Sequence, residues 1–211
     1  KICTQSASSL FNTLIVNEND YISIIYQSFQ NANSLIKAQR LTGNTINYGE
    51  AGHTIIESAP TNFHLIDYKN NILFLSYYDD DNALTGYKAF KLTDTYNLDS
   101  SWPEEGITIL MGEYEFVQKP KMLTTTEGIV FSWIYPDPVD QINKTHIQVI
   151  DNTNNLVFPA EGYVIPTHNC FNTQWNNGLE VYNMSDLPSL NMLKYSIEGD
   201  GITPLWNNDK I

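Results

Sequence analysis

The chain has few cysteines and no long apolar segment. Two of its 211 residues are cysteines, Cys3 and Cys170. That number is too small for a disulfide framework, and the spacing is not that of zinc ligands. A single disulfide between them and two unpaired buried thiols are both open. No apolar run approaches the roughly 18 residues of a membrane-spanning helix, so membrane insertion is not expected.

Charge is also scarce and mostly negative. Only 17% of the residues are charged, and 24 acidic residues against 11 basic ones give a net charge of −13. A field of that sign repels phosphate backbones, so nucleic acid is not expected as a partner. Asn, Thr, Ser, Asp and Tyr supply the remaining polar character, and they suit strands and turns better than helices.

Recognisable catalytic motifs are missing. The sequence contains no Gly-rich phosphate loop, nucleophile elbow or HExxH motif. Its four histidines form no pair with metal-ligand spacing and are interpreted as strand or surface residues: His53, His64, His146 and His168. We therefore predict no catalytic residue, metal or cofactor from the sequence, and the question of enzymatic activity stays open with a preference for none.

Internal repetition is the dominant positive signal. An apolar, β-branched and aromatic run occurs four times, starting at Ile22, Ile72, Ile129 and Leu179. A second run of strand length follows each of them, at 34–41, 87–93, 145–151 and 190–197. Polar connectors between the two runs are typical of β-hairpins. The segment 31–41 also permits a short helix, although the corresponding segments of the other copies favour a strand.

Each unit closes on an aromatic residue followed by a glycine four positions later and an isoleucine seven positions later. Three copies fit: Tyr48, Gly52 and Ile55; Trp102, Gly106 and Ile109; Phe158, Gly162 and Ile165. The fourth copy has Trp206 and no glycine. The predicted repeats span about 3–55, 56–109, 110–165 and 166–211.

These units predict an all-β fold made of four tandem four-stranded antiparallel repeats of about 50 residues, the blades of a β-propeller. Neighbouring residues such as Ile24 and Ile25, or Leu73 and Phe74, are both apolar although they point to opposite faces of a strand. Strands buried on both faces have this pattern, and stacked blades bury both faces. The chain is expected to be one propeller domain or a fragment of one.

The pattern resembles a tandem propeller-repeat family of secreted and cell-surface bacterial proteins. LIKAQRL (35–41), IVFSWIYPD (129–137) and Trp102 with Gly106 and Ile109 carry the likeness to its I-I-x-x-W-x-D, I-x-A-Q-x-I/L and W-x-x-x-G-x-x-I motifs. The resemblance implies an extracellular or cell-surface location. Because a unit boundary falls at each end, from Lys1 to Ile211, we also expect further blades from the same polypeptide or another chain.

The sharpest local feature is an acidic run, Asp79, Asp80 and Asp81, that follows Tyr77 and Tyr78. Oxygen ligands suit Ca²⁺ and aromatic faces suit sugar rings, but the run lacks the spacing of a calcium loop and also fits a solvated hairpin tip. These five residues are the candidate binding residues.

The leading functional expectation is a non-catalytic scaffold, adhesion or protein-interaction module, since rigid repeat surfaces bind protein partners without special residues. The first alternative is a carbohydrate-binding or glycoside-hydrolase-type propeller acting on surface glycans. Acids at equivalent positions of several repeats would distinguish it, because hydrolysis needs two nearby carboxylates. A structural subunit of a larger surface assembly is the second alternative.

Overall fold

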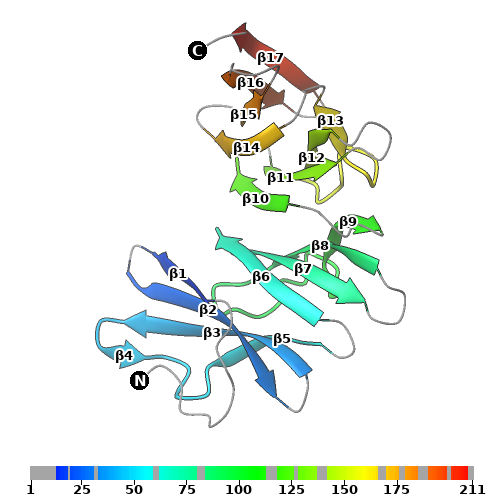
Figure 1. Cartoon of the computed structure of the whole chain (residues 1–211). Coiled ribbons are helices and arrows are strands. Elements are labelled where there is room, and N and C mark those ends of the chain that lie inside the picture. Colours follow the sequence, from blue (N-terminus) through cyan, green and yellow to red (C-terminus); the bar gives the residue numbers. More distant parts are fainter. Residues whose placement is uncertain are drawn as a thin grey trace. The chain divides into compact units, whose positions relative to one another are not determined.

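The computed structural model contains four antiparallel β-sheets (Figure 1). It describes residues 13–18, 20–30, 33–58, 62–79, 84–112, 118–125, 128–136, 142–165, 170–175, 179–184, 190–198 and 201–208. Every helix or strand within these ranges is a β-strand. The all-β prediction is therefore confirmed. Among the same residues, no helix is long and apolar enough to cross a membrane.

The strands of each sheet follow one another in chain order and pair with antiparallel neighbours. The first sheet has a fifth strand, because β4 and β5 both pair with β3. The first two sheets comprise β1 (Thr13–Asn17), β2 (Ile22–Gln30), β3 (Asn33–Thr42), β4 (Thr45–Ile46) and β5 (His53–Ser58), then β6 (Asn62–Lys69), β7 (Ile72–Asp79), β8 (Leu84–Lys91) and β9 (Ile107–Gly112).

The third and fourth sheets have four strands each. They comprise β10 (Gln118–Thr124), β11 (Gly128–Pro136), β12 (Asn143–Asp151) and β13 (Tyr163–Ile165), then β14 (Cys170–Trp175), β15 (Leu179–Met184), β16 (Leu190–Glu198) and β17 (Gly201–Asn208). The segment 31–41 falls mostly in β3, so the strand prediction is confirmed there and the helix alternative is wrong.

The chain divides into two compact units, Lys1–Glu113 with the first two sheets and Tyr114–Ile211 with the last two. In the first unit, β6 packs against β1, β2 and β3. The core between these sheets contains Ile25, Ala38, Leu65, Leu75 and Phe90, each at most 7% exposed. In the second unit β14 packs against β11 and β12. The first strand of a sheet thus contacts the preceding sheet in each unit.

Burial on both faces of the central strands agrees with the apolar pattern of the sequence. Ile24 and Ile25 are 3% and 0% exposed, and Leu73 and Phe74 are both 0% exposed. Val130 and Phe131 in β11 are also buried. Successive residues of a strand point to opposite faces, so these segments of the central strands are buried on both faces.

The three repeated glycines adopt a backbone conformation that other residues rarely take. Gly52, Gly106 and Gly162 have φ values of 70°, 76° and 75°. A Cβ atom on Gly162 would lie 2.6 Å from the carbonyl oxygen of Ile147 and 3.0 Å from the ring of Trp133. The glycine is therefore required both by the positive φ and by close packing.

Two buried glutamines, one in β3 and one in β12, hold the aromatic turn that follows each of these strands. The Oε1 atom of Gln39 accepts a hydrogen bond from the Tyr48 backbone N–H, and its Nε2 donates to the carbonyl of Gly49. Gln148 accepts from the Phe158 N–H in the same way and donates to the Phe158 carbonyl. Both glutamines are fully buried, so these hydrogen bonds satisfy groups that would otherwise be costly to bury.

A second recurring contact fixes the residue before each turn glycine. Lys37 Nζ donates to the Ala51 carbonyl at 3.1 Å, and Lys88 Nζ donates to the Glu105 carbonyl at 3.0 Å. In the third sheet, His146 Nδ1 lies 3.2 Å from the Glu161 carbonyl. The ring of His146 also stacks on Trp133, with an interplanar angle of 19°. This histidine has the structural role of the lysines.

The first strand contains a β-bulge in the second, third and fourth sheets. The register shifts between Leu65 and Asp67 in β6, between Gln118 and Lys121 in β10, and between Cys170 and Asn172 in β14. A bulge adds a residue and exchanges the faces to which the following side chains point. This irregularity is a recurring feature of the repeat.

Candidate functional site

The structure separates the two tyrosines that the sequence groups together. Tyr77 is 6% exposed, packs edge-on against Phe63 at 6.3 Å and lies under the Lys88 ammonium. Tyr78 is 39% exposed on the opposite face. Asp79 ends β7, and its side chain is outside the described residues, as are Asp80 and Asp81. Of the five predicted binding residues, Tyr78 is the one whose side chain is shown at the surface.

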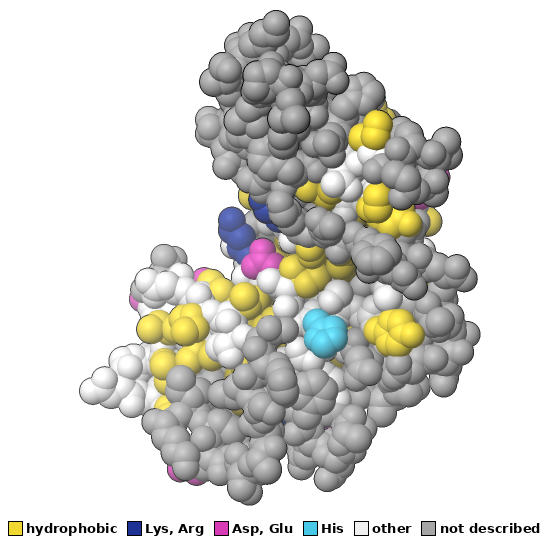
Figure 2. Space-filling view, viewed as in Figure 1, with side chains coloured by type: hydrophobic (Ala, Val, Ile, Leu, Met, Phe, Trp, Pro, Cys, Tyr) yellow, Lys and Arg dark blue, Asp and Glu magenta, His cyan; other side chains and the backbone are white. Residues whose placement is uncertain are grey.

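The surface beside Tyr78 contains an exposed histidine. His64 pairs with Ser76 across β6 and β7, and Tyr78 is two residues beyond Ser76 on the same face. Side chains in this diagonal relation lie about 7–8 Å apart, within reach of aromatic groups. Figure 2 shows a histidine and hydrophobic side chains on the visible face over β6 and β7. Tyr78 and His64 therefore form one exposed surface.

The bulge brings a carboxylate onto this surface. Asp67 lies three residues after His64, and in a regular strand it would point to the opposite, core-facing side. The bulge instead pairs Asp67 with Phe74, which is two residues from Ser76 and so on the same face. One extra residue at the bulge thus places Asp67 on the same face as His64, whereas regular alternation would direct it to the opposite face.

Asp67 is half-buried and makes few interactions. Its Oδ1 accepts a hydrogen bond from the Tyr68 backbone N–H at 2.8 Å. No other hydrogen bond or ion pair joins its carboxylate to the described part of the chain. Burial raises the pKa of this carboxyl, while the Tyr68 N–H and the charge of Lys69 oppose the shift. We call His64, Asp67, Ser76 and Tyr78 together the β6 face.

Equivalent positions in the next two sheets are polar but not acidic. The first residue after the bulge is Asp67 in β6, Lys121 in β10 and Asn172 in β14. Asp67 is also the one Asp or Glu in the four first strands, β1, β6, β10 and β14. The first strands therefore lack a repeated set of carboxylates. Among the described residues, no group of three His, Cys, Asp or Glu side chains could hold a metal ion.

A second polar and aromatic group lies between the first and second sheets. Its centre is Arg40, the one arginine of the chain. The guanidinium carbon of Arg40 is 3.9 Å from the centroid of the Tyr21 ring and 4.9 Å from that of Tyr96. The Nη2 atom donates to the Asp94 carbonyl. We call Tyr21, Arg40, Tyr48, Asp94 and Tyr96 the Arg40 cluster.

The groups of the Arg40 cluster interact with one another and with their neighbours, apart from the buried Arg40 Nε, which has no hydrogen-bond partner among the described residues. The hydroxyls of Tyr96 and the fully buried Ser23 are 2.6 Å apart, and the Tyr48 hydroxyl donates to the Thr95 carbonyl. Asn71 Nδ2 donates to the Asp94 carboxylate at 2.8 Å. These contacts connect the loop after β8 to the first sheet, which is a structural role.

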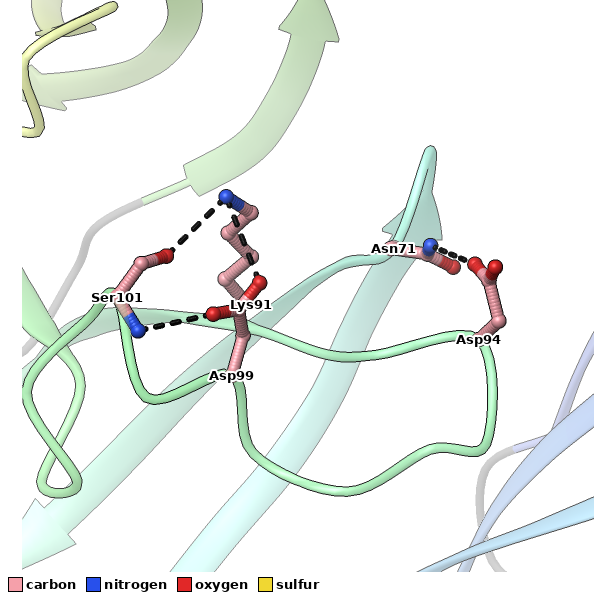
Figure 3. A network of polar contacts seen from close by, with 5 residues as sticks. All are labelled: Asn71, Lys91, Asp94, Asp99 and Ser101. Atoms are coloured by element: carbon pink, nitrogen blue, oxygen red, sulfur yellow. Dashed lines mark hydrogen bonds and ion pairs between the residues drawn. The ribbon is translucent and has the colours of Figure 1, made fainter.

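The same loop holds a small exposed network on its other side (Figure 3). Lys91 Nζ is 3.5 Å from an Asp99 carboxylate oxygen and donates to the Ser101 hydroxyl at 3.2 Å. The Ser101 backbone N–H donates to Asp99, and this hydrogen bond lowers the pKa of that carboxyl. Exposed pairs of this kind contribute little to stability.

The β6 face differs from the Arg40 cluster because its aromatic side chains have no interaction partner in the described part of the fold. The side chains of Tyr78 and His64 make no hydrogen bond, ion pair or ring contact with the described residues. Exposed aromatic and polar groups with no structural partner are available to a ligand. The β6 face is therefore the candidate site.

Three chains of known structure are similar to this one, and the identity is low in the two that follow. An exo-1,5-α-L-arabinanase from a bovine ruminal metagenomic library is 14% identical, with a TM-score of 0.43 over 91% of this chain and 75% of that one. An α-L-arabinanase from Cellvibrio cellulosa is 15% identical, with a TM-score of 0.39 over 92% of this chain and 76% of that one. No protein-family model and no curated protein matches the chain.

These findings correct the leading functional expectation. Both similar structures are enzymes named for arabinan, so the non-catalytic scaffold or adhesion module is wrong, and the carbohydrate-active alternative agrees better. Neither structure assigns a role to a residue of this chain. The site must therefore be argued from the residues of the β6 face.

Sequence reasoning missed His64 and Asp67. His64 was interpreted as a strand or surface residue, and the structure places it on the surface of β6. Asp67 gave no signal, because the alternation of a regular strand assigns it to the core. The other three histidines are not part of the β6 face. The ring of His53 lies against that of Tyr48, His146 contacts the turn before Gly162, and His168 is outside the described residues.

Proposed function

We propose that the four sheets are blades of a β-propeller and that the protein binds a glycan at the β6 face. The observation that carries the proposal is the pair of exposed rings of Tyr78 and His64 on one face of the second sheet, neither of which has an interaction partner among the described residues. The arrangement of the blades and the extracellular location implied by the repeat resemblance are parts of the same proposal.

The chemistry of the β6 face suits a sugar. A tyrosine ring offers a flat apolar surface, and its hydroxyl offers a hydrogen bond at the edge. An apolar sugar face can lie on the Tyr78 ring, while His64 and Ser76 supply donors and acceptors for the hydroxyls of that sugar. Binding sites commonly combine such an aromatic surface with a few polar groups that determine orientation.

The geometry supports binding, and the first strands of the four sheets supply no pair of carboxylates for hydrolysis. Glycoside hydrolysis by the two-carboxylate route needs a second acid within roughly 5–10 Å of the first. Asp67 is the one carboxylate in the first strands, and the equivalent positions carry Lys121 and Asn172. The proposed function is therefore recognition of a carbohydrate, without a proposed reaction.

The test is a glycan array that includes α-1,5-linked arabinan, xylan, cellulose and galactan fragments, followed by titration calorimetry on any glycan that binds. We expect Tyr78→Ala to weaken binding about tenfold or more, since it removes the stacking surface. The matched control is Tyr163→Ala. Tyr163 is also 39% exposed but lies in β13, beside Phe158.

Two results would contradict the proposal. The first is a wild-type protein that binds no glycan on the array. The second is a bound glycan whose affinity falls equally in Tyr78→Ala and Tyr163→Ala, because loss of any exposed tyrosine would then have the same effect. Circular dichroism and thermal unfolding of both variants exclude loss of folding as the cause.

A further inference from the structure

The β6 face is long, and its two ends offer different chemistry. Tyr78 and the position of Asp67 are separated by four residues of β7, from Tyr78 to Phe74, the partner of Asp67. At about 3.3 Å per residue this separation is roughly 13 Å along the strand. His64 and Ser76 lie between the two ends. A single sugar ring on Tyr78 would not reach the carboxylate.

The orientation of Asp67, at the end of the β6 face opposite Tyr78, is fixed by its neighbours. The bulge sets its direction, the Tyr68 backbone N–H fixes one carboxylate oxygen, and buried Phe74 lies beside it. Its second oxygen has no hydrogen bond to the described residues. A carboxylate that is oriented by one oxygen and open at the other can accept hydrogen bonds from sugar hydroxyls.

We propose that the β6 face takes an oligosaccharide rather than a monosaccharide, with one sugar on Tyr78 and a later sugar hydrogen-bonded to Asp67. Asp67 is then the residue that determines the length of the recognised glycan. This inference rests on the proposed glycan binding. The inference specifies the length of the glycan. It also gives a binding role to Asp67, whose side chain would point toward the core in a strand without a bulge.

The experiment measures affinity against chain length. Arabino-, xylo-, cello- and galacto-oligosaccharides from monosaccharide to hexasaccharide are titrated against the wild-type protein, Asp67→Asn and Tyr78→Ala. In the series that binds, we expect the wild-type affinity to rise by about tenfold or more once the chain spans the face, since hydrogen bonds to a charged group have that strength. Asp67→Asn should lose this rise and keep the affinity for short chains.

Asp67→Asn preserves the size of the side chain and an acceptor for the Tyr68 N–H, so the fold should be retained. Asp99→Asn is the control, because it removes the same charge from a carboxylate away from the β6 face. It should bind every length like the wild type.

The outcomes separate the inference from the proposed function. Binding in no series overturns both. Binding that depends on Tyr78 but is equal for monosaccharide and hexasaccharide overturns the inference alone. A length dependence that survives in Asp67→Asn, or is lost equally in Asp99→Asn, overturns the role of Asp67.

Discussion

The Arg40 cluster and the β6 face have similar composition and opposite character. Each combines tyrosines with charged or titratable side chains in the first unit. In the Arg40 cluster, Arg40 lies between two rings and donates to the Asp94 carbonyl, while the Tyr96 hydroxyl is paired with Ser23. On the β6 face, Tyr78 and His64 have no partner among the described residues.

This difference shows why residue type alone does not identify a site. Groups that satisfy one another between two sheets stabilise the fold, and groups left without partners at the surface are available for binding. The two regions should therefore respond in opposite ways to substitution. Changes in the Arg40 cluster should lower the free energy of unfolding, and changes in the β6 face should alter binding while leaving stability almost unchanged.

The largest effect on stability should come from Arg40→Ala. The substitution removes two cation–π contacts and a charged hydrogen bond, so we expect a loss of about 3 kcal/mol in the free energy of unfolding. Chemical denaturation measures it. Arg40→Lys keeps the charge but loses the planar guanidinium, so its free energy of unfolding should lie between those of the wild type and Arg40→Ala.

The contrasting substitution is Lys69→Ala, at the end of β6 and outside the Arg40 cluster. Lys69 is exposed on β6, and its removal should change stability by less than about 0.5 kcal/mol. If Arg40→Ala cost no more than Lys69→Ala, the Arg40 cluster would not hold the loop after β8 to the first sheet.

A smaller effect is expected from Tyr96→Phe. The change deletes the hydroxyl 2.6 Å from the Ser23 hydroxyl and leaves a fully buried group without its partner, which should cost about 1–2 kcal/mol. Adding Ser23→Ala should recover part of the loss, because both polar partners are then gone. Tyr78→Phe removes a hydroxyl that has no hydrogen-bond partner among the described residues, and it should leave the unfolding midpoint unchanged.

Much of the fold could be predicted from the sequence, because it depends on signals that are local and repeated. The paired apolar residues of β2, β7 and β11 predicted burial on both faces, and Gly52, Gly106 and Gly162 marked the turns. Burial of Tyr77 beside exposure of Tyr78 also follows from simple alternation. The pairing of Tyr96 with Ser23 could not be predicted, since it joins residues 73 positions apart.

The position of Asp67 could not be predicted for a different reason. A bulge of one residue reverses the face of every later residue in the strand, and nothing in Leu65, Ile66 or Asp67 marks it. Comparison of the repeats offers a partial signal. The residue after the bulge is polar in three sheets: Asp67, Lys121 and Asn172. In β6 and β10 the next residue is buried, Tyr68 and Met122 respectively.

The smallest expected effect is the pH dependence of stability in Asp67→Asn. Burial raises the pKa of Asp67 in the folded state, so the folded protein disfavours the ionised carboxyl relative to the unfolded chain. Below the ordinary carboxyl pKa of about 4 both states are protonated, and the wild type and the variant should have similar stability. As the pH rises through the raised pKa, the wild type should lose stability relative to Asp67→Asn.

Asp99→Asn should show the opposite dependence. The Ser101 backbone N–H lowers the pKa of Asp99, so the ionised carboxylate stabilises the folded state at neutral pH, and this contribution disappears as the pH falls through the lowered pKa. Denaturation of the wild type and both variants at pH 3 and pH 7 measures the difference. Because Asp67 is about half exposed, its effect should stay below about 1 kcal/mol. If the stability difference between the wild type and the variant changed with pH in the same direction for Asp67→Asn as for Asp99→Asn, the ionised Asp67 would stabilise the fold as Asp99 does. Asp67 would then be a structural residue and not a group available for binding.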